Sequence, residues 1–241
     1  MRSLATALLL GLALLLAPAA HAADPDLAAA EARLAADPDD FEALLGAAEA
    51  GNFEMAKRTN GNLPLVDGLQ DSDANRAIWA ELAPPALDRA RRAHALRPDS
   101  VDAAAALANA YMFYSSSLGI LSAILRGAAG EYTEHATRLI EMDPSHDEGL
   151  GDYLMASYYL VAPWPIGDSD ESLRHYERAA ALAPRSVRNH YGLAVYWARE
   201  GDAEKARRHF DQALALPCTE KTERAFCGFM KAESERARSE L

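Results

Sequence analysis

The sequence predicts an all-α fold, a solenoid of stacked helical hairpins with insertions. The first observation is that alanine-rich helical stretches repeatedly end in a proline that precedes a new amphipathic segment, at Pro38, Pro98, Pro144, Pro184 and Pro217. The second is a pair of helical patterns between Val187 and Cys218, separated by the turn residues Gly201-Asp202. Signals for β-strands are nearly absent. Repeated hairpins of this kind are typical of a protein that binds something along its length.

The last interval between prolines carries the clearest pattern. Its apolar positions are Leu193, Ala194, Trp197, Ala206, Phe210 and Ala213. Small alanines at a helix crossing let two helices approach, and the large side chains fill the adjoining space. This spacing resembles the tetratricopeptide repeat (TPR), a helix–turn–helix unit of about 34 residues. Because one hairpin leaves an apolar face exposed, the resemblance implies that several units stack to bury a continuous core.

The spacing of the prolines gives the organisation of the chain. The intervals are 60, 46, 40 and 33 residues, so the earlier units contain insertions relative to a repeat of about 34 residues. We expect a single helical domain over 23–241, with units near 39–98, 99–144, 145–184 and 185–217 and a capping helix over 219–241. Asp99-Ser100 and Ser145 offer side-chain oxygens for helix starts. Counted from Pro98, the same register repeats the Leu-Ala-x-x-aromatic pattern at Leu107–Tyr111.

Residues 1–22 have the pattern of a signal peptide. Met1-Arg2 gives a positive start, Leu4–Leu16 is an apolar run, and Ala20-His21-Ala22 matches the small-x-small cleavage pattern. We expect export to the periplasm with cleavage after Ala22. The alternative is a retained membrane anchor, but the apolar run is shorter than the roughly 20 residues that a bilayer requires.

The composition disfavours nucleic acid as a partner. The chain has 24 Lys and Arg against 36 Asp and Glu, a formal charge of −12, whereas phosphate binding needs clustered cations. The sequence also lacks the His-Glu-x-x-His metal motif, the Gly-x-Ser-x-Gly nucleophile elbow and a phosphate-binding Gly-Lys-Ser/Thr loop. We therefore expect no catalytic residues, no metal and no cofactor, and a protein that is not an enzyme.

The first two units contain insertions. The first, roughly Gly51–Pro85, is rich in turn signals, so we expect a loop that ends near Asp73, where a helix containing Trp79 begins. The second lies in Ala103–Leu125, 23 residues without one charge. By length this segment could span a bilayer, but its serines and alanines favour a buried helix that continues past its usual turn. We expect no membrane span after signal cleavage.

Cys218 and Cys227 are the two cysteines, and export would place them where disulfides persist. One straight helix would hold their Cα atoms roughly 13 Å apart, beyond the limit of about 7 Å for a disulfide. A bridge therefore requires a bend after Pro217. The alternative is two inert thiols.

The third insertion contains a more specific pattern. Tyr158-Tyr159 is followed by Pro163-Trp164-Pro165-Ile166-Gly167 and then by a helix with Tyr176 and Ala179. This pattern resembles periplasmic TPR proteins related to the T-component of tripartite ATP-independent periplasmic (TRAP) transporters. The resemblance covers roughly 101–216. It implies a passage lined by apolar residues and association with the solute-binding component of a transporter. The chain departs from that family in lacking a lipidation cysteine and in being short.

The TPR resemblance also implies which residues line the groove, because the first helix of each pair faces it. These are Asn109, Met112 and Phe113 in the second unit, Met155, Tyr158 and Tyr159 in the third, and Arg188, Tyr191, Val195 and Arg199 in the fourth. Aromatic faces and planar guanidinium groups suit an extended peptide or an apolar carboxylate. The alternative is that these side chains are covered and belong to the core.

Three functions fit the sequence. The leading hypothesis is a non-catalytic interaction module that docks a protein or peptide partner in its concave face. The second is a transport accessory that holds a small apolar ligand in a helical cavity, and the third is a scaffold for assembly of the cell envelope.

Overall fold

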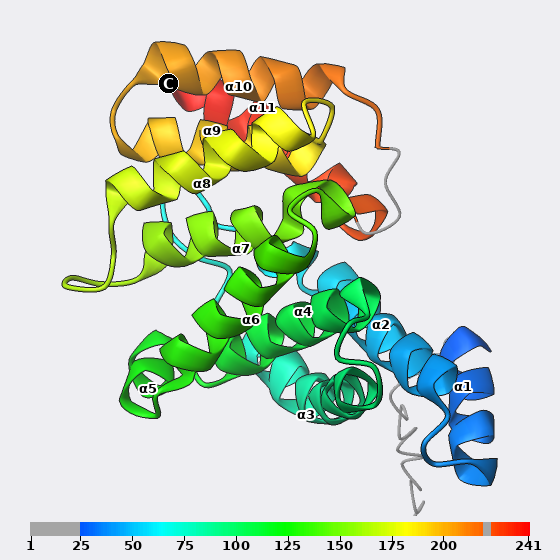
Figure 1. Cartoon of the computed structure of the whole chain (residues 1–241). Coiled ribbons are helices and arrows are strands. Elements are labelled where there is room, and N and C mark those ends of the chain that lie inside the picture. The colour runs from blue at the N-terminus through cyan, green and yellow to red at the C-terminus, as the bar shows by residue number, and fades with distance from the viewer. Residues whose placement is uncertain (1–24, 219–222) are drawn as a thin grey trace, which may run out of the picture.

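The computed structural model describes residues 25–218 and 223–241 (Figure 1). In those residues the fold is all-α and no strand is formed, as the sequence predicts. The predicted signal peptide lies outside the described residues. The helices are α1 (Pro25–Ala36), α2 (Phe41–Arg58), α3 (Asp73–Leu96), α4 (Val101–Ser117), α5 (Ile120–Leu125), α6 (Ala128–Met142), α7 (His146–Val161), α8 (Ser169–Leu182), α9 (Val187–Arg199), α10 (Ala203–Ala215) and α11 (Cys227–Glu240), with short 3₁₀ turns at Asn60–Asn62 and Glu223–Ala225.

The helices form a solenoid of antiparallel hairpins. The pairs are α2 with α3, α4 with α6, α7 with α8 and α9 with α10, and α11 packs against α9 and α10 at the end of the stack. The first helices of successive pairs also contact one another, α2 with α4, α4 with α7 and α7 with α9. They form an inner row along one side of the solenoid, which places their exposed side chains on a shared surface.

Most of these helices begin with a residue whose side chain caps the first turn. The side-chain oxygens of Asp40, Ser100 and Ser186 accept hydrogen bonds from backbone N–H groups at the starts of α2, α4 and α9. Ser145 does not cap α7, contrary to expectation. Its hydroxyl donates to Asp143, and the residues that follow it are not in a regular helical conformation. The first turn of α7 has positive φ at three residues, 43° at Asp147, 57° at Glu148 and 78° at Gly149.

The second insertion is not one extended buried helix. The helix ends at Ser117, the chain turns at Gly119 with φ of 73°, and α5 follows as a separate short helix. Two α5 side chains face solvent, since Leu121 is 73% and Leu125 is 88% exposed. Glycine at the turn takes a left-handed conformation that other residues adopt at a cost, which explains why the helix stops there. Every described helix is too short or too polar to cross a bilayer.

The first insertion forms a loop over residues 59–72, and α3 begins at Asp73 as expected. This loop crosses to the far end of the inner row and contacts α9. The Tyr191 hydroxyl donates a 2.9 Å hydrogen bond to the Pro64 carbonyl oxygen, and Arg199 Nε donates a 2.8 Å bond to the Leu65 carbonyl oxygen. The loop therefore covers the C-terminal part of the inner row.

Close packing between hairpins depends on small residues. A Cβ atom on Gly192 would overlap the Tyr176 ring, so only glycine lets α9 approach α8 this closely. Trp79 is fully buried against Phe113, and its indole N–H donates to the Thr59 hydroxyl at 3.0 Å. The core therefore continues from the first hairpin to the last without a break between units.

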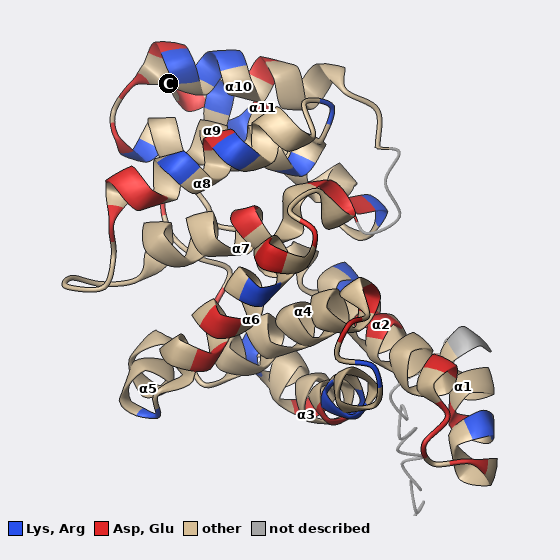
Figure 2. Cartoon of the chain, viewed as in Figure 1, with Lys and Arg blue, Asp and Glu red and all other residues tan. Residues whose placement is uncertain are grey.

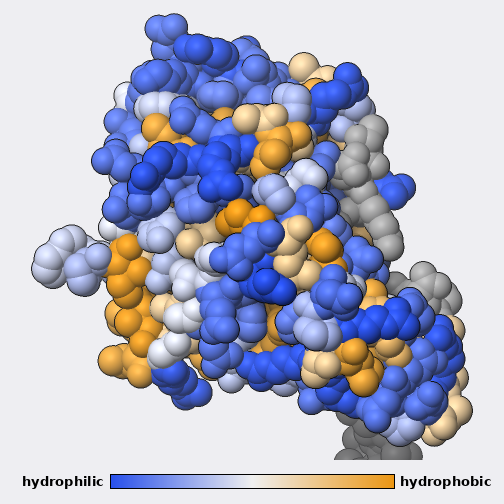
Figure 3. Space-filling view, in the orientation of Figure 1, coloured by the Kyte–Doolittle hydropathy of each residue, from blue (hydrophilic) through white to orange (hydrophobic). Residues whose placement is uncertain are grey.

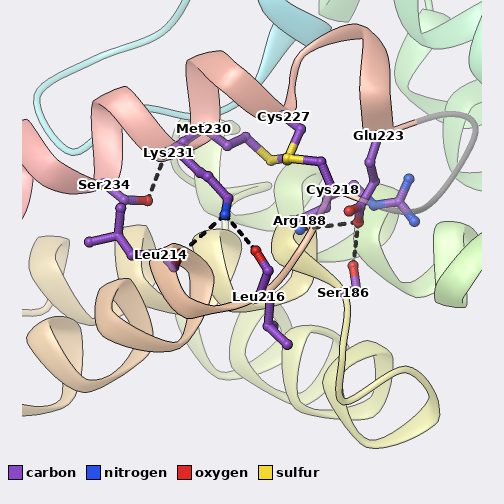
Figure 4. Close-up of a disulfide and its surroundings, with 10 residues drawn as sticks. All are labelled: Ser186, Arg188, Leu214, Leu216, Cys218, Glu223, Cys227, Met230, Lys231 and Ser234. Atoms are coloured by element: carbon purple, nitrogen blue, oxygen red, sulfur yellow. Dashed lines mark hydrogen bonds between the residues drawn. A yellow bond between two sulfur atoms is a disulfide. The ribbon is translucent and has the colours of Figure 1, made fainter.

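The C-terminal segment is fastened to the solenoid by covalent and polar contacts (Figure 4). Cys218 and Cys227 form a disulfide with their Cα atoms 6.0 Å apart. Lys231 Nζ donates to the carbonyl oxygens of Leu214 and Leu216 at the end of α10. These contacts hold α11 against the last hairpin and bring Glu223 beside the start of α9.

Candidate binding groove

The inner row lines a cavity of about 370 Å³. Its walls come from α2, α4 and α7, with contributions from the 59–72 loop, from Arg188 of α9 and from Phe226. The apolar part includes Met112, Phe113 and Leu150, and the polar part includes Asn52 and Asn109. A concave site with an apolar lining and a few convergent polar groups is the usual form of a binding site. We call this the concave cavity.

A second, mostly apolar cavity of about 150 Å³ lies beside the first. Its lining combines the 59–72 loop with α4, α5, α6 and α7, and includes Ile120, Ile124, Tyr132, Tyr158 and Val161. Gly61, Met112, Tyr153 and Leu154 line both cavities. The two spaces are therefore neighbours that share a wall, and we call the second one the apolar cavity.

The residues expected in the groove fall into three sets. Asn109, Met112, Phe113 and Arg188 line the concave cavity. Met112 and Tyr158 line the apolar cavity. The remaining five line neither cavity, namely Met155, Tyr159, Tyr191, Val195 and Arg199. Of the ten, five have buried side chains, namely Phe113, Met155, Arg188, Tyr191 and Val195. Phe113 and Arg188 among them still line the concave cavity.

The loop over 59–72 explains why the C-terminal part of the set is covered. Tyr191 and Val195 are fully buried, and Tyr191 is bonded to that loop. Burial strongly raises the pKa of the Tyr191 hydroxyl. A sequence register places these residues on the inner row but contains no information about a loop from an insertion more than a hundred residues away.

Both guanidinium groups of the expected set have internal partners. Arg188 is 2% exposed, and its Nη1 lies 3.6 Å from the Asp147 carboxylate. Arg199 donates to the carbonyl oxygens of Leu65 and Gly68. The guanidinium N–H groups that the sequence suggested as donors to a ligand carboxylate are therefore engaged within the protein.

A buried cluster of charges surrounds Arg188. The Glu223 carboxylate accepts a hydrogen bond from the Ser186 hydroxyl and a 3.1 Å bond from the Arg188 backbone N–H (Figure 4). Burial, together with a hydrogen bond and repulsion from Glu223, raises the pKa of the Glu148 carboxyl to about 8. At neutral pH, Glu148 is therefore largely protonated, which reduces the repulsion between these neighbouring carboxyl groups.

Asn52 is a cavity residue that the sequence register did not identify. It is 7% exposed, and its Nδ2 donates a 2.9 Å hydrogen bond to the Ala106 carbonyl oxygen. Its Oδ1 has no hydrogen-bond partner among the described residues. The sequence places this amide in the middle of the apolar face of α2. Because a buried polar group normally needs a hydrogen-bond partner, that position was a signal for a cavity residue.

The insertion between α7 and α8 projects from the solenoid as a loop (Figure 1). Trp164 in this loop is 90% exposed, and it lines neither cavity. Apolar atoms gather below the projecting loop in the space-filling view (Figure 3), on the side where α5 lies. Exposed apolar side chains grouped in this way mark an interaction surface more often than isolated ones.

The side chains that could act in catalysis or metal binding are scattered over the described residues. His175 Nδ1 lies 2.7 Å from the buried Asp152 carboxylate, and the rings of His190 and His209 stack. Within residues 25–218 and 223–241, no three His, Cys, Asp or Glu side chains come together as metal ligands would.

Comparisons with known proteins bear on the fold. No family model matches the chain, and none of the curated proteins matches it. Among solved structures, a thermophilic TPR protein of Thermus thermophilus, TTC0263, superposes with a TM-score of 0.57 at 16% identity, over 85% of this chain and 88% of that one.

Two structures of MamA are also similar. One has a TM-score of 0.46 at 15% identity, over 89% of this chain and 90% of that one, and the other has 0.45 at 16%, over 78% and 79%. At 16% identity, the match to the Thermus thermophilus protein shows the fold alone. The chain is a solenoid of TPR-type helical hairpins with insertions.

Proposed function

We propose that this protein is an exported, non-catalytic interaction module of the periplasm, which binds an extended segment of a protein or peptide partner in the concave cavity. Folds of this type bind partners along the surface formed by stacked repeats. The observation that carries the proposal is the cavity of about 370 Å³ along the inner row, which combines an apolar floor with the amides of Asn52 and Asn109. Side-chain amides can donate to and accept from a peptide backbone.

The proposal is tested by crosslinking at Asn109, which is half-buried in the cavity wall. A photoreactive amino acid at position 109 should crosslink to a partner in cells, and one at the exposed Glu134 of α6 should not. The crosslinked partner is then purified and its affinity measured for the wild type and for Asn109→Arg, which fills the cavity mouth. Equal affinity for the two proteins would contradict the groove proposal.

Export is part of the proposal and rests on the sequence of residues 1–22. Protein purified from the native host should begin at Ala23. A mature chain that begins at Met1 would rule out cleavage after Ala22.

A second candidate is a transport accessory of the T-component type, which would hold a small apolar ligand. The apolar cavity favours it, because its volume of about 150 Å³ is bounded by Tyr132, Tyr158, Ile120 and Ile124. An apolar cavity of about this size can hold a small aromatic molecule. Native mass spectrometry of the purified protein tests this candidate. A co-purifying apolar molecule, lost in Ile124→Trp, supports it, whereas an unliganded mass excludes a tightly held ligand.

A further inference from the structure

We propose that the segment bound in the concave cavity is basic: a Lys or Arg side chain lies at an acidic mouth, and a neighbouring apolar side chain lies on the floor. This inference rests on the proposed function, since it specifies the chemistry of the ligand for the same groove. Four features of the cavity support it.

The cation that lines the cavity is already neutralised from within the protein. Among the described residues, Arg188 is the one Lys or Arg that lines the cavity, and it faces Asp147, Glu148 and Glu223. Its Nη2 also donates to the Asp147 carbonyl oxygen. A ligand carboxylate would have to displace these internal acceptors and would approach other carboxyl groups. The arrangement therefore disfavours an anionic ligand.

Besides Arg188 and its partner Asp147, the described lining contains two carboxylates. Glu49 and Asp102 lie on successive helices of the inner row and are exposed. His146 Nε2 lies 3.7 Å from the Asp102 carboxylate. Figure 2 shows further acidic residues around the junction of α6 and α7. Carboxylates at the mouth of a site attract a cationic ligand and repel an anionic one.

Asn52 is an independent sign of a ligand that donates hydrogen bonds. Its Oδ1 is buried and unpartnered among the described residues, and the side chain lines the cavity. The opposite amide orientation would set Oδ1 against the Ala106 carbonyl oxygen, two acceptors together, so the oxygen faces away from that helix. A buried acceptor without a partner costs free energy, which a donor on a ligand would recover. Peptide N–H groups and ammonium groups are both such donors.

The floor of the cavity supplies the apolar contact. Met112, Phe113, Leu150 and Phe226 line it next to the polar groups. Methionine adapts its shape to varied apolar partners, and the aromatic rings supply area. In a segment with adjacent basic and apolar side chains, the basic side chain would pair with the carboxylates at the mouth and the apolar side chain would pack on the floor.

Three synthetic peptides of equal length test the inference on the purified processed protein. They share one sequence of alanine and leucine and carry Lys, Gln or Glu at the same positions. We expect the Lys peptide to bind about tenfold or more tightly than the Gln peptide, and the Glu peptide to bind least. The advantage of the Lys peptide should decrease as salt is raised, because exposed charges are screened.

Two charge-matched variants complete the test. Glu49→Gln with Asp102→Asn should reduce the advantage of the Lys peptide to about threefold or less, with the affinity of the Gln peptide unchanged. Glu81→Gln with Asp99→Asn removes the same charge from exposed positions outside the cavity and should preserve the advantage. Equal or tighter binding of the Gln or Glu peptide would overturn the basic preference but leave the groove. If none of the three peptides binds, the proposed function itself fails.

Discussion

The Tyr191 hydroxyl and the Pro64 carbonyl oxygen are joined by a hydrogen bond of 2.9 Å across 127 positions of sequence. Both residues are buried, and this direct bond attaches the 59–72 loop to α9. The loop thereby converts part of the inner row from a groove surface into core. The exposed groove is confined to the part of the row formed by α2, α4 and the start of α7.

Tyr191→Phe should lower the free energy of unfolding by about 1–2 kcal/mol, because the buried Pro64 carbonyl oxygen loses its donor. Urea unfolding followed by circular dichroism measures the change. Tyr114→Phe is the control, since that half-buried tyrosine has no hydroxyl hydrogen bond among the described residues. A loss in the control equal to that in Tyr191→Phe would show that the effect is not specific to the loop contact.

Arg188 is expected to contribute strongly to stability. Replacement by Met removes the guanidinium that lies beside Asp147 and Glu223 and leaves these carboxylates without it. Loss of one partner of a buried ion pair costs about 3 kcal/mol or more, so Arg188→Met should unfold at a clearly lower urea concentration. Arg207→Met, at an exposed position of α10, should change the free energy by less than about 0.5 kcal/mol. Similar values for the two variants would contradict this account.

Glu148 gives the protein a pH-dependent stability. Burial and Glu223 raise its pKa in the folded protein to about 8, from an ordinary value of 4.5. The folded state therefore binds a proton that the unfolded state releases, and this contribution is complete below pH 4.5 and lost as the pH rises towards 8. Stability should decline between pH 6.5 and 8. Burial lowers the pKa of His94, His135 and His209, and this raises stability as the imidazoles of the unfolded chain lose their protons near pH 6.5, so these histidines oppose the decline only at the lower end of the window.

Glu148→Gln provides the measurement for that window. The neutral amide should remove the decline in melting temperature between pH 6.5 and 8 and make the variant the more stable protein at pH 8. Glu134→Gln, at an exposed position on α6, should retain the wild-type decline. A wild-type protein whose melting temperature is constant over this range would show that Glu148 is already ionised at pH 6.5.

The hairpins could be predicted from the sequence because their signals are local. The alanines at helix crossings, the prolines after each helix and the cap at Ser100 each act within a few residues. The closure of the groove could not be predicted, because the Tyr191–Pro64 contact depends on where a distant insertion folds. The turn at Gly119 was a local signal that the apolar composition of the segment obscured.

The disulfide of Cys218 and Cys227 closes a short loop beside α11. In the chain-entropy account, a loop of this length stabilises the folded state by about 2.5 kcal/mol. Cys218→Ser with Cys227→Ser should lose about that amount, and dithiothreitol should have the same effect on the wild type but none on the variant. A count of two free thiols on the unfolded, unreduced wild type would show that the bridge is absent.

Replacing Trp164 tests whether the projecting loop is a contact surface for a partner or packs against the solenoid. Because its side chain is 90% exposed, Trp164→Ala should leave the free energy of unfolding within about 0.5 kcal/mol of the wild type. The tryptophan emission should shift to shorter wavelength, since the remaining indoles are the buried Trp79 and the half-buried Trp197. An unchanged melting temperature with weaker binding of a purified partner would place the projecting loop in the interface, because the substitution would then have removed contact area and no core packing. A melting temperature lowered by more than about 5 °C would instead mean that the indole packs against the solenoid in solution.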